Sequence, residues 1–124
     1  MSIEKFNFEE HAKKLFEVEK NSIKTIIKTK DTSVCWRSWG KGRPIVFLHG
    51  GYGSWAHWIK QALQFSKKNR VLIPDMPGFG ESEDLSIPHT PEKIASNLVD
   101  SIMELIDISE NPIICGFSFG GLIA

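Results

Sequence analysis

The stretch PIICGFSFGG, residues 112–121, decides which fold this chain is expected to adopt. Its apolar start, residues 112–115, is typical of a strand covered on both faces, and a helix is expected to begin at Phe119. The turn between them has the pattern Gly-x-Ser-x-Gly, with Ser118 flanked by Gly116 and Gly120. Such a sharp connection strains the backbone of the serine, and side chains in place of the glycines would collide with neighbouring backbone. The pattern therefore predicts that Ser118 stands clear of the sheet, where the following helix N-terminus favours negative charge.

The bare pattern also has a second interpretation. Gly-x-Ser-x-Gly arises by chance in roughly one chain of this length in 25, given the usual abundance of glycine and serine. A glycine-rich turn between strand and helix occurs in nucleotide-binding folds as well. The apolar strand before the turn and Gly121 after it favour a nucleophilic serine.

A second glycine-rich segment, HGGYG at residues 49–53, follows the apolar run at 44–48. Acyl transfer needs two N–H donors for the developing oxyanion, and a glycine-rich loop can present its backbone N–H groups freely. We expect one donor from Gly51 and the other from Phe119, the residue after the serine. A phosphate-binding loop is the alternative, but neither Lys-Ser nor Lys-Thr follows, and no Gly-x-Gly-x-x-Gly is present. His49 is expected to brace the loop rather than act as a base.

A third segment, DMPGFGES at residues 75–82, contains the proline and glycines of a tight turn. Asp75 could be a catalytic acid or a residue that binds local backbone amides. We favour the structural role, because the catalytic acid of this topology follows the serine along the chain. Ser82 is likewise expected to belong to the turn.

Outward from these segments, strands alternate with helices. Asn7 and Glu10 form a capping pattern that predicts the start of an N-terminal helix. Period-two alternation predicts strands at 22–29 and 32–39 joined by a hairpin turn, and continuous apolar runs predict buried strands at 44–48, 70–73 and 112–115. Further helices are expected from Ser54 and from Thr90. This order predicts an α/β fold with a mixed, mostly parallel sheet between layers of helices.

Composition narrows the functional classes. Fifteen basic and fifteen acidic residues give a net charge of zero, which argues against partners such as nucleic acid or an anionic membrane surface. The apolar runs are far shorter than the roughly 20 residues that span a bilayer, and the acidic N-terminus is unlike a secretory signal. Cys35 and Cys115 lie in apolar runs without metal-ligand spacing, so we expect buried, reduced thiols. The sequence predicts a cytoplasmic protein.

Together, the three segments resemble the N-terminal part of an α/β-hydrolase. The likeness rests on His49-Gly50-Gly51 after the third strand, residues 75–82 after the fourth, and residues 116–121 after the fifth. The resemblance implies a three-layer sandwich around a mostly parallel sheet. It also implies that Ser118 is the nucleophile and that Gly51 and Phe119 provide the oxyanion-hole amides. A serine at this turn differs from the aspartate that the dehalogenase and epoxide-hydrolase branches use.

The order of the family's catalytic residues, Ser…Asp/Glu…His, has a further implication. All four histidines of this chain precede Ser118; they are His11, His49, His57 and His89. We therefore expect residues 1–124 to be the N-terminal part of one α/β-hydrolase domain, truncated after the nucleophile turn and inactive alone. The resemblance implies an esterase-like serine hydrolase of small, apolar carbonyl substrates, without metal or cofactor. A non-catalytic binding or signalling protein, and an acyltransferase or perhydrolase, remain alternatives on the same fold.

Overall fold

Five strands form one mixed sheet in the computed structural model, which describes residues 3–50, 54–76, 82, 90–117 and 123. The strands are β1 (Ile23–Lys28), β2 (Ser33–Trp39), β3 (Pro44–Leu48), β4 (Arg70–Asp75) and β5 (Ile113–Gly116). Their order in the sheet is β1-β2-β4-β3-β5. β3 is parallel to both β4 and β5, whereas β2 is antiparallel to both β1 and β4. Four strands therefore share one direction, as a mostly parallel sheet requires.

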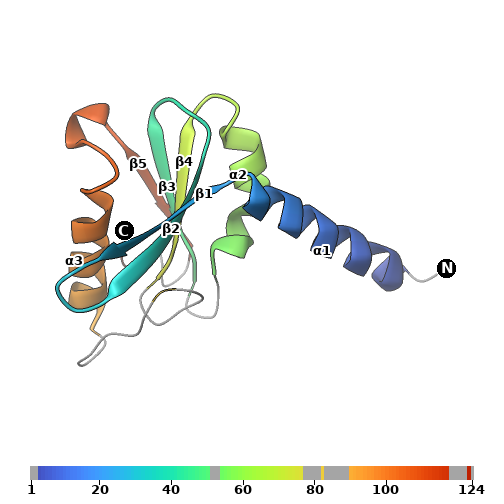
Figure 1. Ribbon diagram of the computed structural model, residues 1–124, viewed down its shortest axis with the longest axis horizontal. Coiled ribbons are helices and arrows are strands. Elements are labelled where there is room, and N and C mark those ends of the chain that lie inside the picture. The colour runs from blue at the N-terminus through green and yellow to red at the C-terminus, as the bar shows by residue number, and fades with distance from the viewer. Residues whose placement is uncertain (1–2, 51–53, 77–81, 83–89, 118–122, 124) are drawn as a thin grey trace.

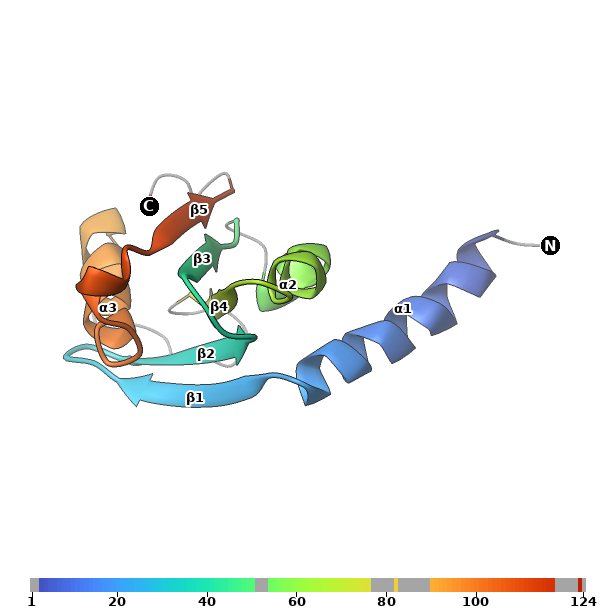
Figure 2. The same cartoon turned by 90° about the horizontal axis from the view of Figure 1, so that it is seen from above.

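Helices cover both faces of the sheet (Figures 1 and 2). α3 (Pro91–Ile102) lies against one face, and α2 (Ile59–Phe65) lies against the other after the 3-10 turn η1 (Trp55–Trp58). A second 3-10 turn, η2 (Ile108–Glu110), precedes β5. The predicted three-layer α/β sandwich is confirmed.

Each face of the sheet buries its own apolar cluster, because successive side chains of a strand point to opposite faces. In β3, Val46 and Leu48 belong to the cluster under α3, whereas Ile45 and Phe47 belong to the cluster under α2. β4 divides in the same way, with Leu72 on one side and Val71 and Ile73 on the other. The continuous apolar runs at 44–48 and 70–73 are thus strands buried on both faces, as predicted.

The N-terminal helix differs from the sequence expectation. α1 runs from Ile3 to Lys20, so Asn7 lies inside the helix instead of capping it. Figure 2 shows α1 projecting away from the sheet, with its C-terminal end nearest β1. Val18, in the last turn, is 3% exposed, and its carbonyl accepts a hydrogen bond from Trp39 Nε1 at 2.8 Å. Within the described residues, no helix is long and apolar enough to span a lipid bilayer.

β5 corrects a second expectation. The strand forms where it was predicted, but Ile113 and Ile114 are 36% and 52% exposed instead of buried. The reason is position, because β5 stands at the end of the sheet order and, among the described strands, pairs with β3 alone. Cys115 is accordingly half-buried, whereas Cys35 on β2 is buried. Neither cysteine is in a disulfide, and the expected burial holds for Cys35.

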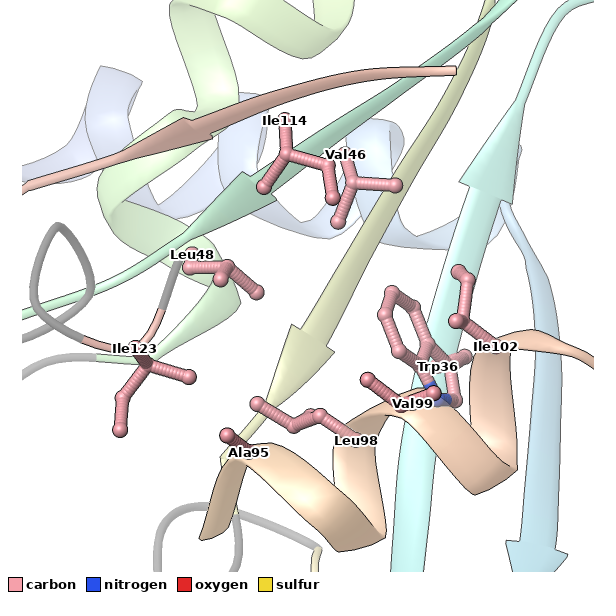
Figure 3. Close-up of a pocket in the computed structure, with 9 residues that line it drawn as sticks. All are labelled: Trp36, Val46, Leu48, Ala95, Leu98, Val99, Ile102, Ile114 and Ile123. Carbon is pink, nitrogen blue, oxygen red and sulfur yellow. The ribbon is translucent and has the colours of Figure 1, made fainter. Parts of the chain in front are cut away.

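An apolar groove of about 80 Å³ lies between α3 and the sheet (Figure 3). The nine described residues that line it carry one polar side-chain atom, the indole nitrogen of Trp36, which already donates to Ser101 Oγ at 2.8 Å. A site that orients a substrate needs polar groups that converge on it. This groove therefore belongs to the core packing around α3 and is not the candidate site.

Candidate active site

The C-terminal ends of β3, β4 and β5 meet at one edge of the sheet, where α/β proteins commonly bind their ligands. Residues 49–50 follow β3, Met76 follows β4, and Phe117 follows β5. The Phe117 N–H donates to the Leu48 carbonyl at 3.1 Å, which continues the β3–β5 pairing beyond β5. All three glycine-rich segments predicted from sequence therefore emerge from the same edge.

Gly50 and Phe117 bring two of these segments into contact. A Cβ atom added at Gly50 would lie 3.3 Å from Phe117 Cδ1 and 3.6 Å from both Cε1 and the carbonyl oxygen of the same residue. The backbone after β3 thus passes directly against the residue that precedes Ser118. Ser118, Gly51 and Phe119, the three predicted site residues, lie outside the described residues. Their described sequence neighbours, Phe117 and Gly50, are packed together.

His49 is fully buried and uses both ring nitrogens. Nε2 is 3.0 Å from the Met76 backbone nitrogen, and Nδ1 is 2.7 Å from the Gly50 carbonyl oxygen. Because the Met76 N–H can only donate, Nε2 must accept, which assigns the ring proton to Nδ1. Burial lowers the pKa of His49 and keeps this neutral form. His49 therefore braces the backbone that follows β3, as predicted.

Asp75 is buried, and both of its carboxylate oxygens are engaged. Oδ1 accepts the backbone N–H of Trp55 at 2.9 Å, and Oδ2 lies 3.1 Å from Arg37 Nη1. The Asp75 carbonyl accepts the hydroxyl of Ser82, whose Oγ accepts the Cys35 N–H at 2.8 Å. Asp75 and Ser82 have structural roles as predicted, although the amide that Asp75 binds belongs to Trp55, which is distant in sequence. The two residues join β4, β2 and η1.

Arg37 is the site residue that sequence reasoning missed. Its guanidinium is buried between Asp75 and Glu19, with Nη2 2.7 Å and Nε 3.0 Å from Glu19 Oε2, and its central carbon lies 4.9 Å from the Trp55 ring centroid. Burial alone would lower the pKa of Arg37, but Cys35, Glu19 and Asp75 together raise it above the ordinary value. The available signal was a lone arginine in an apolar strand, because a buried charge requires partners.

A pocket of about 260 Å³ opens beside these segments, lined by His57, Trp58, Gln61 and Phe117. The Trp58 ring packs against the Phe47 ring, with ring centroids 4.8 Å apart. The walls combine two aromatic surfaces with an imidazole and an amide. Among the described residues, no group of three or more His, Cys, Asp or Glu side chains is arranged to hold a metal ion.

Comparison with known proteins defines the class of protein to which this fold and site belong. Residues 43–124 match the alpha/beta hydrolase fold. The chain belongs to the alpha/beta hydrolase fold family, and the resemblance stated from its three sequence segments is confirmed.

Individual relatives carry hydrolase names. The chain is 32% identical over 88 residues to 2-hydroxymuconate semialdehyde hydrolase of Pseudomonas sp. (strain CF600), an alignment that covers 68% of this chain and 31% of that protein. It is 33% identical over 98 residues to pimeloyl-[acyl-carrier protein] methyl ester esterase of Photobacterium profundum, covering 75% and 34%. The chain spans about a third of the length of these relatives.

A solved structure shows the same arrangement of elements. The Cif epoxide hydrolase from Acinetobacter nosocomialis superposes with a TM-score of 0.77 and 21% sequence identity. The superposition covers 92% of this chain and 39% of that enzyme. At this identity the likeness supports the fold.

Proposed function

We propose that the protein is a serine hydrolase that works through an acyl-enzyme on Ser118. The observation that carries the proposal is the contact between Gly50 and Phe117, where a Cβ on Gly50 would meet the Phe117 ring at 3.3 Å. Gly51 follows the first of these residues and Ser118 follows the second. A serine nucleophile and a backbone donor on adjoining segments are what acyl transfer requires.

The proposed reaction has two halves. Ser118 Oγ attacks the substrate carbonyl while its proton passes to a histidine base, and the N–H groups of Gly51 and Phe119 stabilise the oxyanion. Collapse of the tetrahedral intermediate expels the leaving group with a proton from the histidine, and water then releases the acyl group by the same steps. His49 does not supply this base, because both of its ring nitrogens are engaged in the buried bridge. No metal or organic cofactor enters these steps.

The substrate class follows from the pocket beside Phe117. Its Trp58 and Phe117 walls suit an apolar or aromatic group, and His57 and Gln61 can contact a polar substituent. We infer a small ester, amide or related carbonyl compound as substrate. Two cysteines outside any disulfide and a net charge of zero support a cytoplasmic enzyme whose partner is a small molecule instead of nucleic acid or a membrane surface.

A fluorophosphonate probe tests the proposal, because it phosphonylates activated serines. The experiment uses the intact protein, with whatever sequence its gene adds to these 124 residues. We expect labelling on the peptide that contains Ser118, and loss of both labelling and ester hydrolysis in Ser118→Ala. The matched control is Ser109→Ala at an exposed serine on η2, which should leave both unchanged. Labelling that survives Ser118→Ala would overturn the assignment and favour a non-catalytic role for this turn.

A further inference from the structure

Segment 50–54, which carries Gly51, is tied at both ends to two consecutive residues at the end of β4. At its start, His49 accepts the Met76 N–H at 3.0 Å and bridges to the Gly50 carbonyl at 2.7 Å. At its end, the Trp55 N–H donates to Asp75 Oδ1 at 2.9 Å. The residues that flank 51–53 are therefore bonded to the Asp75 carboxylate and to the backbone amide of the next residue, Met76.

The position of this segment matters for an oxyanion donor. Such a donor acts only when it lies about 2.7–3.1 Å from the developing charge, and a displacement of about 1 Å can lower the rate roughly 100-fold. Three of the five residues in segment 50–54 are glycine, the residue type that restricts the backbone least. A donor in such a sequence depends on the restraint of the residues that flank it.

Arg37 in turn restrains both Asp75 and Trp55. Its Nη1 lies 3.1 Å from Asp75 Oδ2, the oxygen that Trp55 does not use, and its guanidinium stacks 4.9 Å from the Trp55 ring centroid. Arg37 thus contacts both partners of the Trp55–Asp75 hydrogen bond. Glu19 on α1 forms an ion pair with Arg37 at 2.7 Å. The Glu19 side chain is 42% exposed. The strongest restraint is expected at buried Asp75 and the weakest at Glu19, where solvent screens the pair.

We propose that Asp75, backed by Arg37, is a positioning residue of the hydrolase. It touches no substrate, but it fixes the segment that presents the Gly51 N–H and so sets the geometry of the oxyanion site. This inference rests on the function proposed above. It assigns a role in catalysis to a buried aspartate that also links β4 to β2 and η1.

The test compares Asp75→Asn and Asp75→Ala in the intact protein. Asp75→Asn keeps an oxygen for the Trp55 N–H but loses the charge that holds Arg37, whereas Asp75→Ala loses both. Asp100→Asn, at an exposed aspartate on α3, is the matched control. The readouts are kcat and KM per active site, counted by fluorophosphonate titration, and the affinity for a boronic acid that bonds to the serine as a transition-state analogue.

A positioning role predicts a fall in kcat per titrated site of about tenfold for Asp75→Asn and about 100-fold for Asp75→Ala. KM should stay within about twofold, because the oxyanion forms only after substrate has bound. Affinity for the boronic acid should fall in step with kcat, while Asp100→Asn should match the parent protein. A purely structural Asp75 would lower the melting temperature and the number of titratable sites without changing kcat per site.

The outcomes separate the two proposals. If the parent protein takes no label on Ser118, the proposed function fails and this inference fails with it. If the parent is labelled and Asp75→Asn keeps its kcat per site within about twofold and its affinity for the boronic acid, only the positioning role is overturned. Should Asp75→Ala fail to fold, Asp75→Asn alone decides the question.

Discussion

The ends of β4 and β5 lie on either side of β3 at the same edge of the sheet, yet they are built in opposite ways. At the end of β4, Asp75 and Met76 are 1% and 0% exposed, and the carboxylate holds both Arg37 and the Trp55 N–H. At the end of β5, Phe117 is 61% exposed, and its N–H donates to the Leu48 carbonyl.

The buried end of β4 is suited to supporting the fold, whereas the exposed end of β5 is suited to contact with a substrate. A buried polar group with all its partners in place is costly to disturb, so it suits a scaffold. An exposed residue whose backbone is fixed by a neighbouring strand can contact a substrate. An acidic residue at the end of β4 is therefore a poor candidate for a catalytic acid even though it lies at the right edge, and the residue after Phe117 is a good candidate for a nucleophile.

Removing Arg37, the cation that pairs with Asp75 at the end of β4, should produce the largest effect, a loss of folding stability. Arg37→Ala leaves the Asp75 carboxylate buried without its charged partner, and breaking a buried ion pair in this way costs about 3–5 kcal/mol. We expect a loss of that size in the free energy of unfolding of the intact protein, measured in urea. Arg43→Ala, at an exposed arginine whose Nε donates to the Asn111 carbonyl, should cost less than about 1 kcal/mol. An equally small loss for Arg37→Ala would contradict the supporting role of this network.

A substitution at Gly51, in the segment that follows β3, should affect the reaction rate instead. Gly51→Val introduces a β-branched side chain at a predicted oxyanion donor, and the loss of one donor costs about 2.7–4 kcal/mol of transition-state stabilisation. Steady-state kinetics should therefore show a kcat about 100- to 1000-fold lower. Lys67→Val, which places the same side chain on the exposed surface beyond α2, should keep the parental kcat. Unchanged kcat in Gly51→Val would remove the oxyanion role from this residue.

A smaller effect should come from His49, which links the end of β3 to Met76 at the end of β4. Burial lowers its pKa, so the native state takes up a proton less readily than the unfolded chain does. The resulting stability is fully present above the ordinary histidine pKa of about 6.5 and is lost as pH falls below that value toward the lowered pKa. Urea unfolding at a series of pH values from 7.5 to about 5 should show this decline, and His49→Gln should reduce it. His57 contributes a smaller part of the lowering of the His49 pKa, so His57→Gln should leave most of the decline in place.

Local pattern was enough to predict much of this molecule, because strands, caps and turn residues depend on near neighbours in sequence. Thr90 caps α3, accepting the Lys93 N–H at 3.2 Å, and His49 and Asp75 have the structural roles assigned to them. The oxyanion and nucleophile assignments stay predictions, since Gly51, Ser118 and Phe119 lie outside the described residues.

What pattern could not provide depends on register and sheet order. Arg37 reaches Asp75 because β2 and β4 pair with Arg37 opposite Ile73, which places Asp75 diagonally across on the same face. No spacing rule links residues 19, 37 and 75. The apolar run at 112–115 likewise resembles that of β3, and only the sheet order reveals that β5 pairs on one side and exposes Ile114.

Trapping the covalent intermediate tests the central claim most directly. The intact protein is mixed with excess p-nitrophenyl butyrate, quenched in acid within milliseconds, digested and analysed by mass spectrometry. The account predicts a burst of p-nitrophenol equal to the number of active sites, with the butyryl group on the peptide that contains Ser118. A butyryl group on another residue, or turnover that persists in Ser118→Ala, would contradict it.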